Sequence, residues 1–200
     1  MLILYYILPE KRMRSETFLS TLEQLPIAKK RRIRKIRDNQ AQLQSIIGLK
    51  LLKLGFESLG LRKFHLRKLS FPANKPVLYN ASYFSISHSE NCICCVISKT
   101  SAIGIDVEKI RFLSAKIINR YHLKQEKISP VTAWTRKEAV LKVYPEDSLS
   151  ELKEIQLKDN AAAFKDRHYF INSFTLEKNF TMSIARLQPN TKIKIKRVYF

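Results

Sequence analysis

A hydrophobic run long enough to cross a membrane is missing from the start of this 200-residue sequence. The opening apolar stretch, residues 2–8, is much shorter than the about 20 residues that a bilayer requires. It lacks a charged n-region, and Pro9-Glu10 follow it at once, so we do not expect a signal peptide. The stretch is typical of a first β-strand. We therefore predict a cytoplasmic protein with no membrane partner.

Glycine is also scarce, with only four in the chain, and no stretch is rich in Pro, Gly and Ser together. Long flexible linkers are therefore not expected, and composition marks no clean domain boundary. Hydrophobic residues make up 45% of the sequence, which is ordinary for a soluble globular protein. The length suffices for one large domain or for two small lobes that share a core.

Cysteine is limited to three residues, Cys92, Cys94 and Cys95. The odd number and the adjacency of two of them argue against a disulfide framework. His88 lies close by, which leaves a zinc site open, but the spacing is not that of a zinc knuckle. We favour the alternative, in which these cysteines are small apolar residues on a buried strand.

Acidic residues are few, with 17 Asp and Glu against 37 Lys and Arg, and the net charge is +20. Such a surface attracts polyanions, which include nucleic acids, anionic lipids, phosphorylated ligands and acidic proteins. Charge alone does not choose among them.

Hydrophobic periodicity and turn residues predict the order of the elements. In the first half we expect a strand at 2–8, helices at 16–25, after Pro26 and at 38–54 with Gly55 as C-cap, and strands at 83–88 and 91–99. In the second half we expect a strand at 103–108, helices at 114–121 and 124–144, and strands at 151–158, 167–176, 179–187 and 191–199. This order predicts an α+β fold with two similar halves, residues 1–100 and 101–200.

Two carboxylates, Asp106 and Glu108, lie two residues apart on the strand expected at 103–108. Side chains two apart on a strand face the same side, about 6–7 Å from each other. Adjacent carboxylates repel unless a cation lies between them, and oxygen ligands of this kind suit Mg²⁺. The alternative is an edge strand whose polar face meets water, and the spacing alone favours that alternative.

A third carboxylate, Glu138, shares one face of a predicted helix with Trp134 and Lys142, because the spacing is i, i+4, i+8. Glu138 is a candidate metal ligand and Lys142 a candidate phosphate contact, but an ordinary Glu–Lys pair on a solvated face fits the same spacing. His88, flanked by Ser87 and Ser89, is a candidate phosphate donor, although a lone histidine is more often structural.

Taken together, these segments resemble the signature motifs of the 4′-phosphopantetheinyl transferase superfamily, in its surfactin-type branch. The motifs are found in the expected order at 84–89 (FSISHS), 104–109 (GIDVEK) and 134–142 (WTRKEAVLK). Residues 74–76 and 120–126, the basic helix after Pro26 and the segment 46–48 also have counterparts there. The resemblance covers most of residues 26–142. It implies an α+β fold of two pseudo-symmetric halves in one chain, with the site at their interface.

The resemblance implies an enzyme that transfers the phosphopantetheine arm of coenzyme A to a serine of a carrier protein. Asp106, Glu108 and Glu138 would hold Mg²⁺, with Mn²⁺ as a substitute, and Lys142 would contact the pyrophosphate of coenzyme A. Glu126 matches the glutamate that serves as base in the family. The implied catalytic residues are thus Glu126, Lys142 and Asp106.

The same resemblance implies the residues that hold the nucleotide end of coenzyme A. Ser87 and His88 would contact it, Lys75 would bind its 3′-phosphate, and Lys29 and Arg32 of the basic helix would assist. The partner would be an acyl, peptidyl or polyketide carrier protein, and these are typically acidic, which suits the positive charge. We expect a monomer that does not bind nucleic acid.

Two departures from the family pattern distinguish this chain. Gln44 stands where the family commonly has an arginine, so a phosphate contact is lost or is supplied by a neighbour such as Arg37. His122-Leu123 replace the usual Phe-Ser pair near Glu126. Two other readings stay open: a basic nucleic-acid-binding module, and an inactive homologue that binds coenzyme A or a carrier without transfer.

Overall fold

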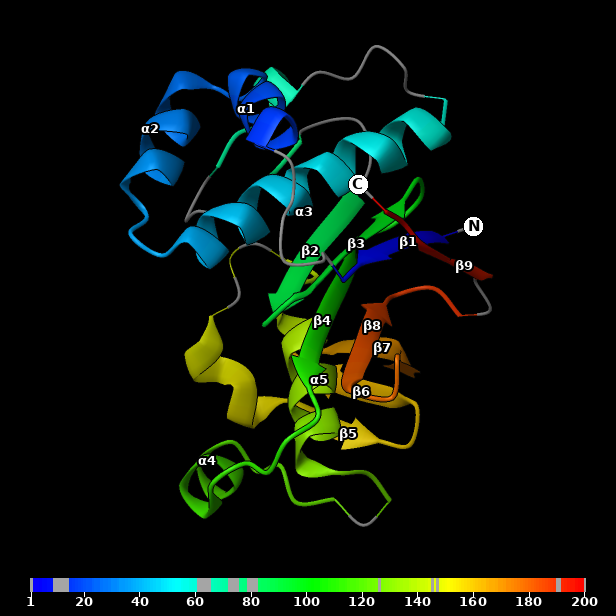
Figure 1. Ribbon diagram of the computed structural model, residues 1–200. Helices are drawn as coiled ribbons and strands as arrows, with labels where there is room; N and C mark the ends of the chain where they lie inside the picture. Colours follow the sequence, from blue (N-terminus) through cyan, green and yellow to red (C-terminus); the bar gives the residue numbers. More distant parts are fainter. Residues whose placement is uncertain are drawn as a thin grey trace.

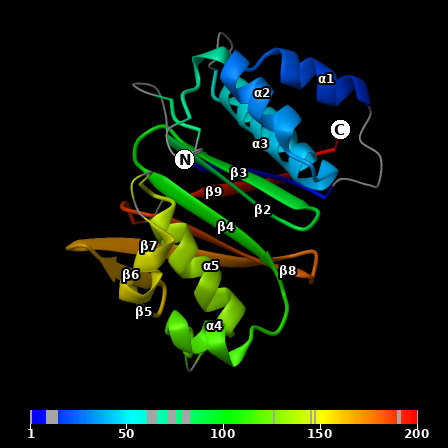
Figure 2. The same ribbon diagram turned by 90° about the vertical axis from the view of Figure 1, so that its left-hand side faces the viewer.

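Two β-sheets lie face to face, and helices cover the outer face of each, as the two views of the ribbon show (Figures 1 and 2). This computed structural model confirms the α+β class. It describes residues 2–8, 15–60, 66–71, 76–78, 83–125, 127–144, 146, 148–189 and 192–199.

The first sheet has four strands in the order β2-β3-β1-β9. Its strands are β1 (Leu2–Ile7), β2 (Tyr83–Ser89), β3 (Cys92–Ser98) and β9 (Ile193–Arg197). Strand β1 pairs antiparallel with β3 and parallel with β9, so the last strand of the chain lies beside the first. Alternation along β1 places Ile3, Tyr5 and Ile7 on the helix side, and Leu2 and Leu4 toward the second sheet.

Three helices cover the outer face of the first sheet (Figure 2). They are α1 (Ser15–Glu23), α2 (Ile27–Lys35) and α3 (Asn39–Ser58). The Asp38 side chain caps α3 by accepting from two backbone N–H groups of the first turn. Gly55 is not a C-cap, and that prediction was wrong. It lies inside α3, where a Cβ would come 1.9 Å from Ile97 Cδ1, and the helix ends before Gly60, whose φ is +84°.

The second sheet has five strands in the order β4-β8-β7-β6-β5, and every neighbouring pair is antiparallel. Its strands are β4 (Ile103–Lys109), β5 (Gln156–Lys158), β6 (Ala161–Phe164), β7 (Arg167–Leu176) and β8 (Phe180–Arg186). Helix α5 (Pro130–Leu141) packs on its outer face, and the short α4 (Ala115–Arg120) precedes it. Gly104 makes this packing close, since a Cβ there would lie 1.9 Å from the carbonyl oxygen of Ala139.

Two predicted elements of the second half differ from the structure. The helix expected at 124–144 begins only at Pro130, because the Ser129 side chain caps it by accepting from Thr132 N. The strand expected at 151–158 is a 3-10 helix, η3 (Leu149–Glu154), followed by β5. Ser148 and Glu151 form a capping box that starts η3, a local signal that the strand prediction did not take into account. Strand β6, rich in alanine, was not predicted.

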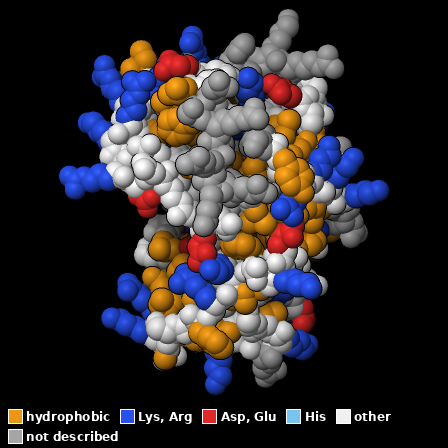
Figure 3. All heavy atoms as spheres, in the orientation of Figure 1, with side chains coloured by type: hydrophobic (Ala, Val, Ile, Leu, Met, Phe, Trp, Pro, Cys, Tyr) orange, Lys and Arg blue, Asp and Glu red, His pale blue; other side chains and the backbone are white. Residues whose placement is uncertain are grey.

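Three apolar clusters hold these layers together: one between the helices and the first sheet, one between the sheets, and one under α5. The three cysteines are buried, free thiols of β3, which confirms the strand interpretation over a disulfide. On the face shown in Figure 3, Lys and Arg side chains project around much of the outline, in keeping with the net charge. No helix in the described ranges is both long and apolar enough to span a membrane.

Candidate active site

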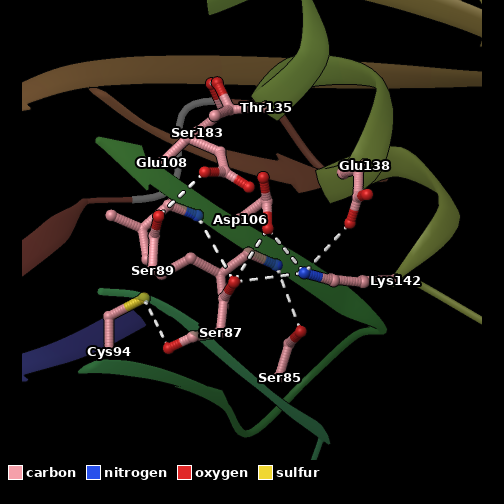
Figure 4. Close-up of polar contacts among 12 residues, drawn as sticks. Ser85, Ser87, Ser89, Cys94, Asp106, Glu108, Thr135, Glu138, Lys142 and Ser183 are labelled. Carbon is pink, nitrogen blue, oxygen red and sulfur yellow. Dashed lines mark hydrogen bonds and ion pairs between the residues drawn. The ribbon is translucent and has the colours of Figure 1, made fainter. Parts of the chain in front are cut away.

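The candidate site lies where the edge strands of the two sheets meet. Strand β2 is the edge of the first sheet and β4 is the edge of the second, and the two strands lie side by side. Ser85, Ser87 and Ser89 of β2 alternate with Phe84, Ile86 and His88, so their hydroxyls share one face. That face points at β4, as the hydroxyl contacts with β4 show (Figure 4).

The centre of the site is a buried ion pair between Asp106 and Lys142. Lys142 Nζ lies 2.5 Å from Asp106 Oδ1, and the Asp106 side chain is only 3% exposed. The Ser87 hydroxyl donates to the same Oδ1 at 2.8 Å and accepts from Lys142 Nζ at 3.1 Å. Strand β4, strand β2 and the end of α5 each supply one of these groups, so the site depends on how the layers pack.

Helix α5 adds Glu138, one turn before Lys142. Lys142 Nζ lies 3.2 Å from Glu138 Oε2, and the two residues have the i, i+4 spacing expected from the sequence. The prediction that Glu138 and Lys142 share a helix face is therefore confirmed. The alternative of a solvated Glu–Lys pair does not hold, because the ammonium also binds the buried Asp106 (Figure 4).

The charges of this cluster depend on one another. Burial raises the pKa of the Asp106 carboxyl above its usual value, and the Lys142 charge and the Ser87 hydroxyl partly offset that effect. Burial alone would lower the pKa of the Lys142 ammonium, but the carboxylates of Asp106 and Glu138 outweigh it and raise that pKa. Lys142 is therefore protonated at neutral pH. Its charge makes an ionised Asp106 tolerable at this depth.

Glu108 lies on the same strand as Asp106 but has partners of its own. The Ser89 hydroxyl donates to Glu108 Oε2 at 2.8 Å, and the Arg111 guanidinium lies 3.8 Å from the same oxygen. The Glu108 side chain is 21% exposed, so it lies at the rim of the cluster, whereas Asp106 lies at its base.

One observation favours a cation beside Asp106, where Mg²⁺ would need only one or two carboxylates together with phosphate oxygens. Oδ2 of Asp106 is buried and has no hydrogen-bond partner among the described residues, and a carboxylate oxygen in that state is costly. Within the described ranges, however, no three His, Cys, Asp or Glu side chains lie close enough together to hold a metal ion. The ammonium of Lys142 bridges two of the carboxylates instead.

Other candidate residues lie away from this cluster or outside the described part of the chain. His88 alternates with Ser87 on β2 and lies on the other face of the strand. Partial enclosure of the imidazole and then the Lys142 charge lower the pKa of His88. Lys75 and Glu126 lie outside the described residues.

The two basic-helix candidates, Lys29 and Arg32, both lie on α2. Lys29 is half-buried with its ammonium 4.7 Å from the centre of the Phe71 ring. Burial and then the neighbouring Arg32 lower the pKa of Lys29. Among the described residues, no hydrogen bond, ion pair or ring contact joins either of them to the Asp106 cluster.

Two sets of contacts near the site were not predicted from the sequence. The first is that of Ser89, which binds Glu108; the period-two serines of β2 were the available signal. The second is that of the pair Gln40 and Gln44, whose side-chain amides donate to the carbonyl oxygen of Glu90 at 2.8 and 2.6 Å. Glu90 is in the β2–β3 turn and has a φ of +47°. The hydrogen bond from Gln44 therefore holds this turn against α3.

Comparisons with known proteins agree with the motifs. No family model matches the chain. A curated protein, the 4′-phosphopantetheinyl transferase gsp of Aneurinibacillus migulanus, is 29% identical over 140 residues. The chain is similar to a phosphopantetheinyl transferase. This confirms the resemblance drawn from the motifs. The match covers 64% of this chain and 55% of the relative, so the chain spans about half the length of the curated protein it matches.

Proposed function

We propose that this protein is a Mg²⁺-dependent 4′-phosphopantetheinyl transferase that uses coenzyme A and modifies a serine of a carrier protein. The observation that supports it most is the cluster of Asp106, Glu138 and Lys142, placed by motifs that resemble this superfamily. The proposal also accounts for the charge of +20, since coenzyme A is a polyanion and carrier proteins are typically acidic.

The residues have separate roles in this proposal. Asp106, Glu108 and Glu138 would hold the cation, with the buried Oδ2 of Asp106 as the oxygen that lacks another partner. A bound divalent cation would neutralise charge on the pyrophosphate of coenzyme A. Lys142 is protonated and already lies within 3.2 Å of two carboxylates. Phosphate oxygens would compete with those carboxylates for its ammonium, and the carboxylates released in this way would be available to the cation.

The reaction requires little covalent chemistry from the protein. The serine oxygen of the carrier forms a bond to the β-phosphorus of coenzyme A, and the bond from that phosphorus to the bridging oxygen breaks. The product 3′,5′-ADP leaves with the bridging oxygen, and the serine proton passes to a base, for which Glu126 is the candidate. Charge develops on the leaving phosphate, and the ammonium of Lys142 would stabilise that charge. Positioning of the two substrates supplies much of the remainder.

An exposed apolar surface beside Glu108 is where we expect the carrier to bind. Phe112 is fully exposed and Ile110 is 46% exposed, and Arg111 lies between them. Apolar side chains next to basic ones suit a partner with an acidic surface. The carrier serine would then reach the site from the rim at Glu108, which is more open than the base at Asp106.

The test is incubation of apo carrier proteins with the protein, coenzyme A and Mg²⁺, followed by intact mass spectrometry of the carrier. We expect a gain of about 340 Da, the mass of the transferred arm, and its loss when EDTA is added. Acyl, peptidyl and polyketide carriers are tested in parallel, because the site does not distinguish them. No gain on any of the three classes would contradict the proposal.

The two rival functions give different outcomes in companion experiments. An inactive homologue would bind coenzyme A in a titration but would modify no carrier. A nucleic-acid-binding module would bind DNA or RNA with strong salt dependence, indifferent to Mg²⁺ and coenzyme A. Asp106→Ala separates these readings further, since it should abolish transfer and leave nucleic-acid binding unchanged.

A further inference from the structure

A row of serine hydroxyls joins the two sheets where backbone pairing is absent. Strand β4 is hydrogen-bonded to β8 along one edge, and its other edge faces β2 of the first sheet. Along that edge the backbone N–H groups of Ile105, Val107 and Lys109 donate to serine hydroxyls of β2 instead of to carbonyl oxygens. We call Ser85, Ser87 and Ser89 the serine ladder.

The register of the serine ladder is regular. Ser85 Oγ accepts from Ile105 N at 3.1 Å, Ser87 Oγ from Val107 N at 3.4 Å, and Ser89 Oγ from Lys109 N at 3.2 Å. Two residues separate each step on both strands. A one-residue slip between β2 and β4 would therefore break all three bonds at once.

Two of the three hydroxyls also donate to a carboxylate. Ser87 donates to Asp106 at 2.8 Å and Ser89 donates to Glu108 at 2.8 Å. A hydroxyl has one proton to donate and lone pairs that accept. In each case the proton is donated to the carboxylate, and the oxygen accepts from the backbone N–H group. Each of these serines thus ties one carboxylate to the main chain of its own strand (Figure 4).

The third serine provides a natural comparison. The residue of β4 that precedes Ile105 is Gly104, which has no side chain for Ser85 to bind. Ser85 therefore accepts a backbone hydrogen bond from the same edge of β4 as Ser89 does. It has no carboxylate to bind, because Gly104 stands where Ser89 has Glu108. The two serines differ in this respect and otherwise share the strand, the face and the type of backbone contact.

We infer that Ser89 is a positioning residue for cation binding: its hydroxyl holds Glu108 Oε2 against β4, so that the carboxylate stays beside the Asp106 cluster. This inference rests on the proposed function, because it assumes that a divalent cation binds there. Without the hydroxyl, the other partner of Glu108 Oε2 among the described residues is Arg111, which lies on the exposed side at 3.8 Å. Glu108 would then turn outward, toward the guanidinium.

The experiment compares Mn²⁺ binding by electron paramagnetic resonance, in the presence of coenzyme A, for the wild type and three variants. Ser89→Ala removes both contacts, Ser89→Thr keeps the hydroxyl, and Ser85→Ala removes only a backbone contact. We expect Ser89→Ala to weaken Mn²⁺ affinity by about 10-fold or more, the usual effect of losing a group that orients a metal ligand. Ser89→Thr should restore the affinity, and Ser85→Ala should change it by less than about twofold.

A double-mutant cycle with Glu108→Gln tests whether Ser89 acts through that carboxylate. If Ser89 acts through Glu108, adding Ser89→Thr or Ser89→Ala to Glu108→Gln should have no further effect on Mn²⁺ affinity. Thermal unfolding of each variant reports lost stability separately, and we expect both Ser85→Ala and Ser89→Ala to lower it.

The outcomes separate the inference from the proposed function. Equal Mn²⁺ affinities for Ser89→Ala and Ser85→Ala, with a wild type that binds Mn²⁺ and modifies a carrier, would overturn the role of Ser89 alone. A wild type that binds no Mn²⁺ and modifies no carrier would overturn the proposed function and the inference with it.

Discussion

Lys142→Met is the substitution whose consequences the structure defines most sharply. Methionine has a similar length but no charge, so the variant leaves Asp106 buried with its ion-pair partner removed. Breaking a buried pair by removing one partner typically costs about 3–5 kcal/mol. For a chain of this size that corresponds to a fall of about 6–20 °C in the unfolding temperature.

The loss should depend on pH in a defined direction. Burial raises the pKa of Asp106 in the folded state, and removal of the Lys142 charge removes the largest influence that opposes this. The folded variant then binds a proton that the unfolded chain has already lost above its ordinary pKa of about 3.9. The free energy of unfolding of Lys142→Met should therefore fall as the pH rises from the pKa of Asp106 in the unfolded chain to its higher pKa in the folded protein. The fall should be steeper than for the wild type.

Two further measurements test the reasoning on this variant. Asp106→Asn combined with Lys142→Met should recover most of the lost stability, since no uncompensated charge stays buried. Mg²⁺ should stabilise Lys142→Met, because a cation can take the place of the ammonium, by about 2.7 kcal/mol at a concentration of 100 times Kd. Differential scanning calorimetry over a pH series measures both. A variant as stable as the wild type at pH 8 would refute the account of a buried, interdependent pair.

Three further predictions concern packing and titration elsewhere. Gly104→Ala should lower stability by about 1–3 kcal/mol and reduce transfer, because its Cβ would lie 1.9 Å from the Ala139 carbonyl oxygen of α5; urea unfolding and the mass assay check this. Burial lowers the pKa of Lys137 to about 8, so the wild type should gain stability relative to Lys137→Met as pH rises from about 8 to 10.4. A flat difference across that interval would contradict it. Burial raises the pKa of Cys92 to about 12, and all three buried thiols should resist alkylation until the chain unfolds.

The sequence correctly predicted the features that depend on residue spacing within a single strand or helix. Period two predicted β4, and the i, i+4 spacing predicted that Glu138 and Lys142 share a face of α5; both are confirmed. The strand interpretation of the cysteine segment is confirmed for the same reason, because a run of small apolar residues fits a buried strand.

The sequence did not predict the features that depend on packing between segments distant in the chain. The contact of Lys142 with Asp106 depends on how α5 packs on β4, which no local pattern contains. Gly55 looked like a helix end, but its lack of a side chain serves the approach of α3 to β3. The division at residue 100 and the pseudo-symmetry of the halves stay predictions, as do the roles of Lys75 and Glu126.

Anomalous X-ray scattering from crystals grown with Mn²⁺ and coenzyme A tests the central claim most directly. The account predicts a Mn²⁺ peak bound by Asp106, Glu108 and Glu138, with the Lys142 ammonium moved from the carboxylates toward the pyrophosphate. Coenzyme A bound with no peak at these carboxylates, or with Lys142 still paired to Asp106 and Glu138, would contradict it.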